Sequence, residues 1–206
     1  MPKHLFLRGP IGIGKSTAIR DAVLDNLAHV GGFYVQRVLS NGQHAGFALN
    51  PLHSGSTYVL EKEIDSDTAE RMFIIKDKNG FRHNLDVFAQ VGVDCLRDNL
   101  KRCPALTVLD ETGGIELLCV EFRDILYETL ERLPCIGTVK SAANTAHMAK
   151  NVPRIISAKT AQDEYLHMLT HTCSSRILDM TEANRQTLRQ ETLRFVKACM
   201  QTNMSC

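Results

Sequence analysis

One short segment near the start of the chain has the residue types and spacing of a phosphate-binding loop. It fits the pattern G-x-x-x-x-G-K-[ST] and consists of Gly9, Pro10, Ile11, Gly12, Ile13, Gly14, Lys15, Ser16 and Thr17. Glycines let the backbone curl so that successive N–H groups point inward at phosphate oxygens. Lys15 would bring a positive charge to the β- and γ-phosphates, and the Ser16 hydroxyl would ligate Mg²⁺. The segment therefore predicts a nucleotide-binding site with Mg²⁺ as cofactor.

A second segment supplies two carboxylates at the end of an apolar run. Residues 105–109 are apolar apart from Thr107, and Asp110 and Glu111 follow directly. We expect Asp110 to join Ser16 in holding Mg²⁺, usually through a bound water. We expect Glu111 to align a water at the γ-phosphate or to accept its proton, so that Glu111 and Lys15 are the predicted catalytic residues. Glu116 is expected to be a solvated or capping residue.

The elements that must position these groups alternate between strands and helices. A strand at residues 4–7 precedes the loop, and a helix at residues 16–30 follows it and ends at Gly31-Gly32. Further strands are expected at 105–109 and 135–139, and further helices at 85–102 and 116–133. This alternation favours an α/β fold, a three-layer P-loop NTPase sandwich with a mostly parallel sheet.

Between the first helix and the helix at 85–102, the pattern is typical of antiparallel strands. Asn41-Gly42 separates β-rich runs at 33–39 and 43–49, which is a strong hairpin signal because both residues tolerate positive φ. Runs at 56–60 and 72–76 are further strand candidates. We interpret residues 1–206 as a single domain with a β-hairpin insertion at about 33–82.

The last third of the chain is less regular. Residues 140–153 are polar and are expected to form a loop with some helix, and residues 154–157 a short turn or strand. A weak helix is expected at 162–170 and a short strand at 176–180. Thr181 is expected to cap a last helix that runs to about Met200.

Composition excludes several classes of protein. The chain has 206 residues, 44% hydrophobic and 23% charged, with a formal net charge of +1. Such a balance gives no electrostatic signal for nucleic-acid binding. No apolar run approaches the roughly 18 residues that a membrane helix needs, and the apolar run at 5–7 is too short for a signal-peptide core.

The cysteines favour a reduced, cytoplasmic protein. They are seven, an odd number, and contain no C-x-x-C pair. Disulfides and a zinc site are therefore not expected. The expected ligand is a nucleoside triphosphate, with no membrane partner, and the sequence points to no protein partner.

The chain resembles a small nucleoside-triphosphatase family often called cancer-related nucleoside-triphosphatase (THEP type). Five pieces, spread over nearly the whole chain, carry the resemblance. They are Gly9–Thr17, Gly32-Phe33-Tyr34 with Ala45-Gly46-Phe47, Leu109–Leu117, Gly137-Thr138-Val139, and Thr181–Arg185. The phosphate loop is common to many families, whereas the Gly-Phe-Tyr hairpin with the Asp-Glu-x-Gly-x-x-Glu segment is much more specific.

The resemblance implies a P-loop fold with an added strand between the loop strand and the acidic strand. It also implies Mg²⁺-dependent hydrolysis of triphosphates such as ATP and GTP to diphosphate and phosphate, with little base selectivity. Many members carry Lys where this chain has Gly114, and a β-branched apolar residue where it has Thr112. If that lysine neutralises phosphate charge, either another cation replaces it here, with Lys140 as a candidate, or turnover is slower. Arg185 matches the family's Asn-Arg pair, as a helix-start residue or as a nucleotide contact.

Three other functions are compatible with the same motifs. A nucleoside or nucleotide kinase would use the same loop but pass phosphate to a small acceptor. It normally brings an Arg-rich lid, and residues 140–153 contain no arginine. A regulatory GTPase could use Asp110–Gly113 as D-x-x-G and Ser157-Ala158-Lys159 as S-A-K, but no N-K-x-D occurs to read guanine. A non-catalytic ATP-binding adaptor would leave Glu111 as a surface acid.

Overall fold

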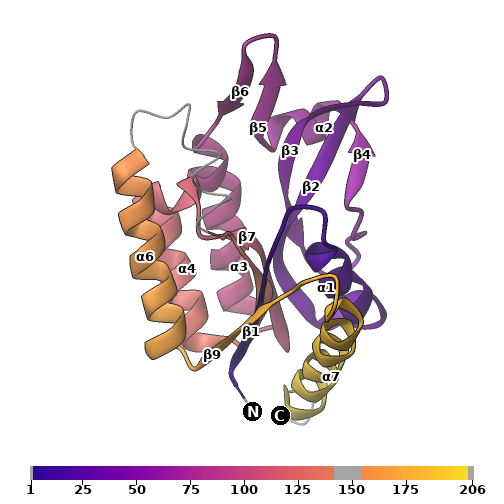
Figure 1. The fold of residues 1–206 in the computed structure, drawn as a ribbon, viewed down its shortest axis with the longest axis vertical. Coiled ribbons are helices and arrows are strands. Elements are labelled where there is room, and N and C mark those ends of the chain that lie inside the picture. Colours follow the sequence, from indigo (N-terminus) through magenta and orange to yellow (C-terminus); the bar gives the residue numbers. More distant parts are fainter. Residues whose placement is uncertain (1, 142–154, 204–206) are drawn as a thin grey trace.

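The computed structural model describes residues 2–141 and 155–203. In these residues, nine strands form one sheet with helices on both of its faces (Figure 1). The strands are β1 (His4–Arg8), β2 (Val30–Ser40), β3 (Gln43–Leu52), β4 (Glu61–Glu63), β5 (Met72–Asp77), β6 (Gly80–His83), β7 (Leu106–Thr112), β8 (Cys135–Val139) and β9 (Ser175–Asp179). The helices are α1 (Lys15–Val23), α2 (Ser66–Glu70), α3 (Val93–Arg102), α4 (Val120–Arg132), α6 (Ile155–His171) and α7 (Arg185–Asn203).

The strand order is β6-β5-β3-β2-β7-β8-β1-β9, and β4 pairs with β2. Pairing is parallel between β2 and β7, β7 and β8, β8 and β1, and β1 and β9. It is antiparallel between β2 and β3, β3 and β5, and β5 and β6. β8 lies between β1 and β7, as the family resemblance implied. Because these three strands are parallel, their carboxyl ends meet at one edge of the sheet, and this edge carries the predicted site.

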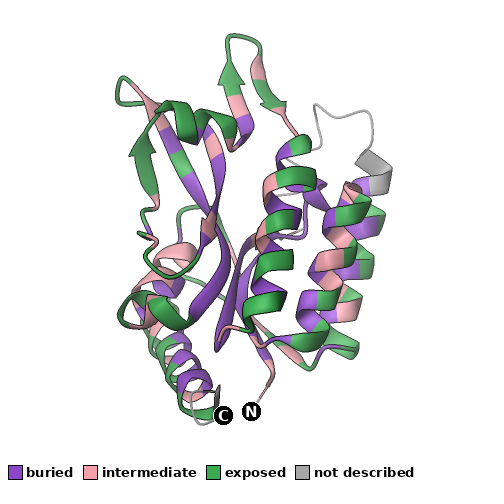
Figure 2. Ribbon diagram, turned by 180° about the vertical axis from the view of Figure 1, so that it is seen from behind, coloured by how far each residue is buried: buried purple, intermediate pink, exposed green. Residues whose placement is uncertain are grey.

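Side chains alternate between the two faces of the sheet, and each face has its own apolar core. On β1, Leu5 and Leu7 pack into the cluster with α1 and α7, whereas Phe6 packs into the cluster with α3, α4 and α6. Figure 2 shows the buried central strands between these helices. The α/β sandwich with a mostly parallel sheet is therefore confirmed.

The predicted Asn-Gly hairpin is present. Asn41 and Gly42 both have positive φ, 52° and 73°, and join β2 to β3. The hairpin strands continue the same sheet, and their turn lies at the upper right of Figure 1, beside α2 and β4. The prediction of a strand at 56–60 is wrong, since β4 begins only at Glu61. Side chains of β2 bond this segment instead, because Tyr34 donates to the Thr57 carbonyl and Gln36 to that of Val59.

Gly31 and Gly32 do not end the first helix, which is a correction to the sequence-based expectation. α1 ends at Val23, a short 3-10 helix covers Leu24–His29, and both glycines lie inside β2. A Cβ on Gly31 would lie 1.8 Å from Asn99 Oδ1, and one on Gly32 would lie 2.0 Å from the Val108 carbonyl oxygen. The glycines are required by the close approach of β2 to β7 and α3, not by a turn.

The helix expected at 85–102 is present, since residues 86–102 are continuously helical, with a π-helical turn at Phe88–Gly92 before α3. The helix expected at 116–133 is interrupted, because a 3-10 helix at Ile115–Leu118 precedes α4. Among the described residues, no helix combines the length and apolar character needed to cross a membrane.

The last third of the chain differs at two points from the expectation. Residues 155–157 belong to α6 rather than to a turn or strand, while residues 142–154 lie outside the described part. Thr181 does not cap the last helix, since α7 begins at Arg185. Asn184 organises this turn instead, because its side chain accepts from the Thr181 N–H and donates to the Asp179 carbonyl. The strand expected at 176–180 is present as β9.

His4 on β1 gives the fold a testable acid sensitivity. Burial, with a further contribution from Lys3, lowers the pKa of His4 from 6.5 to about 4. The unfolded chain therefore binds a proton at a pH at which the folded chain does not. This contribution to stability is complete above about pH 6.5 and is lost as the pH falls towards 4, up to about 3 kcal/mol at about 1.36 kcal/mol per pKa unit.

Replacing His4 by Gln is expected to flatten the pH dependence of stability in this window. Gln can still accept the Cys135 N–H that His4 Nδ1 accepts at 3.1 Å, but it does not titrate. Urea unfolding at several pH values would measure the effect, with the exposed His53→Gln as control. If the free energy of unfolding changes with pH equally in the wild type and in His4→Gln, the acid sensitivity does not come from His4.

Candidate nucleotide site at the carboxyl edge of the sheet

The loop between β1 and α1 has the backbone that the glycine pattern predicted. Gly9, Gly12 and Gly14 have φ values of 153°, 79° and 97°. A Cβ on Gly12 would meet nothing within 4 Å, so at this position the left-handed φ alone explains the glycine. A Cβ on Gly9 would lie 2.5 Å from the Met180 carbonyl oxygen, so this glycine also admits the segment that follows β9.

The loop leads into α1 at Lys15, whose side chain folds back over the loop. Its Nζ donates to the carbonyl oxygens of Gly9 at 3.0 Å and Pro10 at 2.8 Å. Burial lowers the pKa of Lys15, and the nearby charges of Glu111 and Asp110 act in the opposite direction. The structure therefore places a partly buried ammonium group on the carbonyl oxygens of the loop, within electrostatic reach of the acids of β7.

Asp110 lies across the sheet edge from the loop. Ser16 Oγ donates to its Oδ1 at 3.0 Å, Thr138 Oγ1 donates to the same oxygen at 2.8 Å, and the Val35 N–H donates to Oδ2 at 3.4 Å. Burial raises the pKa of Asp110, and these hydrogen bonds oppose the shift. Its carboxylate thus ties together β2, β7, β8 and the first turn of α1.

Glu111 has a distinctive backbone. Its φ is +59°, a value that is uncommon for a residue with a side chain, and its N–H donates to Thr138 Oγ1 at 2.8 Å. The register between β7 and β8 shifts between Leu109 and Thr112, so Asp110 and Glu111 bulge out of the regular ladder. The bulge allows two consecutive acids to serve the same edge of the sheet.

Burial also raises the pKa of Glu111, and the charge of Lys140 is the largest opposing cause. Asp110 raises it further, whereas Lys15 lowers it. The residue Glu111 is half-buried. A partly desolvated carboxylate is a suitable proton acceptor.

Two groups at this edge were not assigned from the sequence. Thr138 bonds both Asp110 and Glu111, and the signal for it was its place in the Gly-Thr-Val strand end. Glu116 was expected to be a solvated or capping residue; it is 1% exposed, so it is not solvated, but it does cap the N–H of Gly114 at the start of the 3-10 helix. Its Oε1 accepts from the Gly114 N–H at 2.6 Å, and its Oε2 pairs with Lys140 Nζ at 3.2 Å. The sequence pattern predicted that Glu116 begins an α-helix, where an acid is usually exposed. In the structure residues 115–118 form a 3-10 helix in which Glu116 is buried.

The other loop residues differ in exposure. Ile13 is buried in the core, whereas Ile11 is 83% exposed and Pro10 is exposed beside it. Arg185, at the start of α7, lies next to the loop, with its Cδ 4.0 Å from the place of a Cβ on Gly14. Its guanidinium is 3.6 Å from the exposed Glu182, so it lies beside the site but does not bond its acids.

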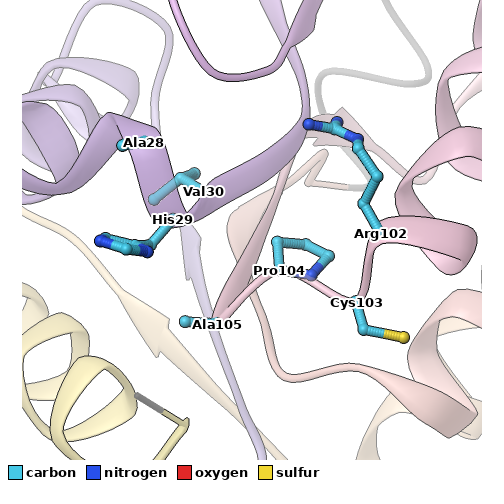
Figure 3. Close-up of a pocket in the computed structure, with 7 residues that line it drawn as sticks. All are labelled: Ala28, His29, Val30, Arg102, Cys103, Pro104 and Ala105. Carbon is cyan, nitrogen blue, oxygen red and sulfur yellow. The ribbon is translucent and has the colours of Figure 1, made fainter.

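A pocket of about 370 Å³ lies at the opposite edge of the sheet and is unrelated to this site (Figure 3). It lies where β2 and β7 begin, whereas the loop and the acids lie where β1 and β7 end. Its lining residues are Ala28, His29, Val30, Arg102, Cys103, Pro104 and Ala105.

Comparison with known proteins agrees with this architecture. A family model described as NTPase matches residues 4–193. A mouse protein named cancer-related nucleoside-triphosphatase homolog is 27% identical over 154 residues, which is 68% of this chain and 76% of the relative. Nucleoside-triphosphatase THEP1 of Thermotoga sp. (strain RQ2) is 22% identical over 193 residues, 94% of this chain and 95% of the relative.

Solved structures show the same fold. The solution structure of a human cancer-related nucleoside triphosphatase has a TM-score of 0.62 at 24% identity, covering 95% of this chain and 97% of that one. The crystal structure of THEP1 from the hyperthermophile Aquifex aeolicus has a TM-score of 0.59 at 14% identity, covering 94% and 98%. Since the family model spans most of the sequence, from β1 into α7, this chain belongs to the NTPase family.

Proposed function

We propose that this protein is a Mg²⁺-dependent nucleoside-triphosphatase that hydrolyses ATP, GTP and other triphosphates to diphosphate and phosphate. One observation carries the proposal. Ser16 Oγ of the phosphate loop and Asp110 Oδ1 of the acidic strand are 3.0 Å apart, and Glu111 follows directly. The names of the relatives, which are nucleoside-triphosphatases, also support it.

The residues present fit Mg²⁺. A hydroxyl oxygen and a carboxylate oxygen are hard donors, and the ion prefers few protein ligands together with phosphate oxygens and water. Ser16 and Asp110 would hold it, and Thr138 keeps the carboxylate of Asp110 oriented through its 2.8 Å hydrogen bond. When bound, Mg²⁺ supplies positive charge that polarises the phosphoryl oxygens.

The chain's own groups account for the remaining chemistry. The amides of residues 9–14 would bind the β- and γ-phosphates, and Lys15 would exchange its two carbonyl partners for phosphate oxygens. Glu111 would orient a water molecule and accept its proton as the water oxygen bonds to the γ-phosphorus. The bond from that phosphorus to the β,γ-bridging oxygen breaks, and the diphosphate leaves with that oxygen.

Low base selectivity follows from the same assignment. The groups assigned above would bind phosphate, the cation or the attacking water, and none of them is assigned a contact with the base. Rates for ATP, GTP, CTP and UTP are therefore expected to be similar.

The test is multiple-turnover phosphate release by the purified protein from each triphosphate alone, with Mg²⁺ and with EDTA. Release that requires Mg²⁺ and needs no acceptor would support hydrolysis. Release only when a nucleoside or nucleotide is added, with the phosphate found on it, would show a kinase instead. Nucleotide binding without turnover would show an adaptor.

Replacing Asp110 by Asn is expected to weaken the Mg²⁺ dependence without abolishing nucleotide binding. Asn keeps the shape but removes the negative charge, and changes to groups that hold a metal or its ligands typically cost about 10- to 100-fold in affinity. The Mg²⁺ concentration that gives half-maximal rate should rise by that factor. Asp163→Asn, an exposed change on α6, is the control. An unchanged Mg²⁺ titration would remove Asp110 from the metal site.

A further inference from the structure

An ion pair lies buried beside the site, and the mechanism above does not use it. Lys140 Nζ and Glu116 Oε2 are 3.2 Å apart, and their side chains are 6% and 2% exposed. Taking two charges out of water is unfavourable, and a buried pair is often no more stabilising than apolar residues of the same size. The pair therefore has no clear value as a stabilising contact alone, and its location indicates another use.

Lys140 lies at the carboxyl edge of the sheet, beside the candidate nucleotide site. It directly follows β8, the strand between the loop strand β1 and the acidic strand β7. Its backbone is held on both sides, because its N–H donates to the Thr112 carbonyl at 2.9 Å and its carbonyl accepts from Gln162 Nε2 at 3.0 Å. The base of this side chain is thus fixed between the phosphate loop and the two acids.

Gly114 leaves the space that the lysine side chain occupies. A Cβ on Gly114 would lie 2.6 Å from Lys140 Nζ, 2.8 Å from its Cδ and 2.9 Å from Glu116 Oε2. Glu116 is itself held by the Gly114 N–H at 2.6 Å. The segment 114–116 therefore forms a cradle for one ammonium group, and any side chain at 114 would displace it.

The charges around this ammonium group come from three elements. Glu116 pairs with it. The charge of Lys140 also lowers the pKa of Glu111, at the bulge of β7, more than the charge of Lys15 does. On β6, the charge of Lys140 contributes to the lowered pKa of His83, after burial. The ammonium group is thus bonded to Glu116 and within electrostatic reach of Glu111.

We propose that Lys140 is a second catalytic cation, whose ammonium group leaves Glu116 to contact the γ-phosphoryl oxygens of the bound triphosphate. The proposal rests on the proposed function. A preformed positive charge aimed at developing phosphoryl charge is a large source of rate enhancement, and a lysine on a flexible stem can act as a movable point charge. Glu116 is then a positioning residue that holds the cation until the nucleotide enters.

The decisive experiment compares Lys140→Met with the neutral pair Lys140→Met/Glu116→Gln. The single variant leaves a buried carboxylate without its partner, so it is expected to be less stable and slower. The double variant removes both charges, so its urea-unfolding midpoint should return towards wild type. Its kcat should nevertheless stay about 10²- to 10³-fold low, the usual effect of losing one such stabilising group, while the affinity for ATP changes much less.

A second variant keeps every charge. Gly114→Ala adds one methyl group where the ammonium group lies, and the far end of a flexible side chain can move aside. The φ of Gly114 is −132°, so alanine adds no left-handed strain. Because the methyl group displaces the ammonium group from Glu116, we expect an unfolding midpoint below that of wild type. At a temperature where the variant is folded, we expect a kcat at least about 10-fold lower, because a misplaced catalytic group costs rate.

The outcomes separate the two proposals. No Mg²⁺-dependent phosphate release by the wild type would overturn the proposed function and this inference with it. Wild-type release together with a double variant whose kcat is within about threefold of wild type would overturn the role of Lys140 alone. In that case the ion pair would be a structural contact, and Gly114→Ala should also retain its activity.

Discussion

Replacing Glu111 by Gln is expected to lower phosphate release by about 10²- to 10⁴-fold, which is the usual contribution of a positioned general base. Gln has almost the same shape but cannot accept the proton of the attacking water. Nucleotide binding should persist, because neither the loop amides nor Lys15 changes. The positive φ of Glu111, 59°, is set by the bulge in β7 and is equally tolerable for Gln. Steady-state phosphate release and nucleotide binding by calorimetry would measure the two effects.

Glu70→Gln is the matched control, since Glu70 is exposed at the end of α2 and distant in sequence from the site. It should leave both rate and binding unchanged. If Glu111→Gln retains the wild-type rate within a few-fold, Glu111 is not the base and water activation must be assigned elsewhere.

Replacing Lys15 by Ala is expected to impair binding as well as rate. Its ammonium group bonds two loop carbonyls in the described structure and would bond phosphate oxygens in the complex. One hydrogen bond to a charged group contributes about 1.5–3 kcal/mol, so affinity for ATP should fall about 10- to 150-fold. Turnover at saturating ATP should also fall, because the same charge stabilises the transferring phosphoryl group.

The control for this variant is Lys101→Ala, which removes an exposed lysine at the end of α3. Lys15→Ala has a second effect that Lys101→Ala lacks, because it removes a positive charge that lowers the pKa of Glu111. Equal ATP affinity in Lys15→Ala and wild type would show that the triphosphate does not lie in the loop.

The backbone of the loop and the contact of Ser16 with Asp110 could be predicted from the sequence, because a phosphate-loop pattern has fixed spacing. Positions 9, 12 and 14 need positive φ, and Lys15 and Ser16 must follow directly. The meeting of Ser16 with Asp110 followed from the parallel sheet, in which strands far apart in the chain end at one edge. Neither inference required knowledge of packing.

The parts that were missed depend on packing between distant segments. Lys140 was a candidate cation from the sequence, but its partner Glu116 is 24 residues away, and the pairing arises only when the turn at 115–118 folds against the end of β8. The same reason explains Gly31 and Gly32, whose crowding by α3 and β7 no local pattern reveals. Local patterns also misplaced the start of α7, because Asn184 rather than Thr181 ties that turn to β9.

A crystal structure of the Glu111→Gln variant with ATP and Mg²⁺ would test the proposed hydrolysis site most directly. We expect the triphosphate on the amides of residues 9–14 and Lys15 Nζ on phosphate oxygens. We also expect Mg²⁺ at Ser16 Oγ, with Asp110 next to it and a water between the substituted side chain at position 111 and the γ-phosphorus. Triphosphate bound away from the loop, or a side chain at 111 turned away from the γ-phosphate, would contradict it.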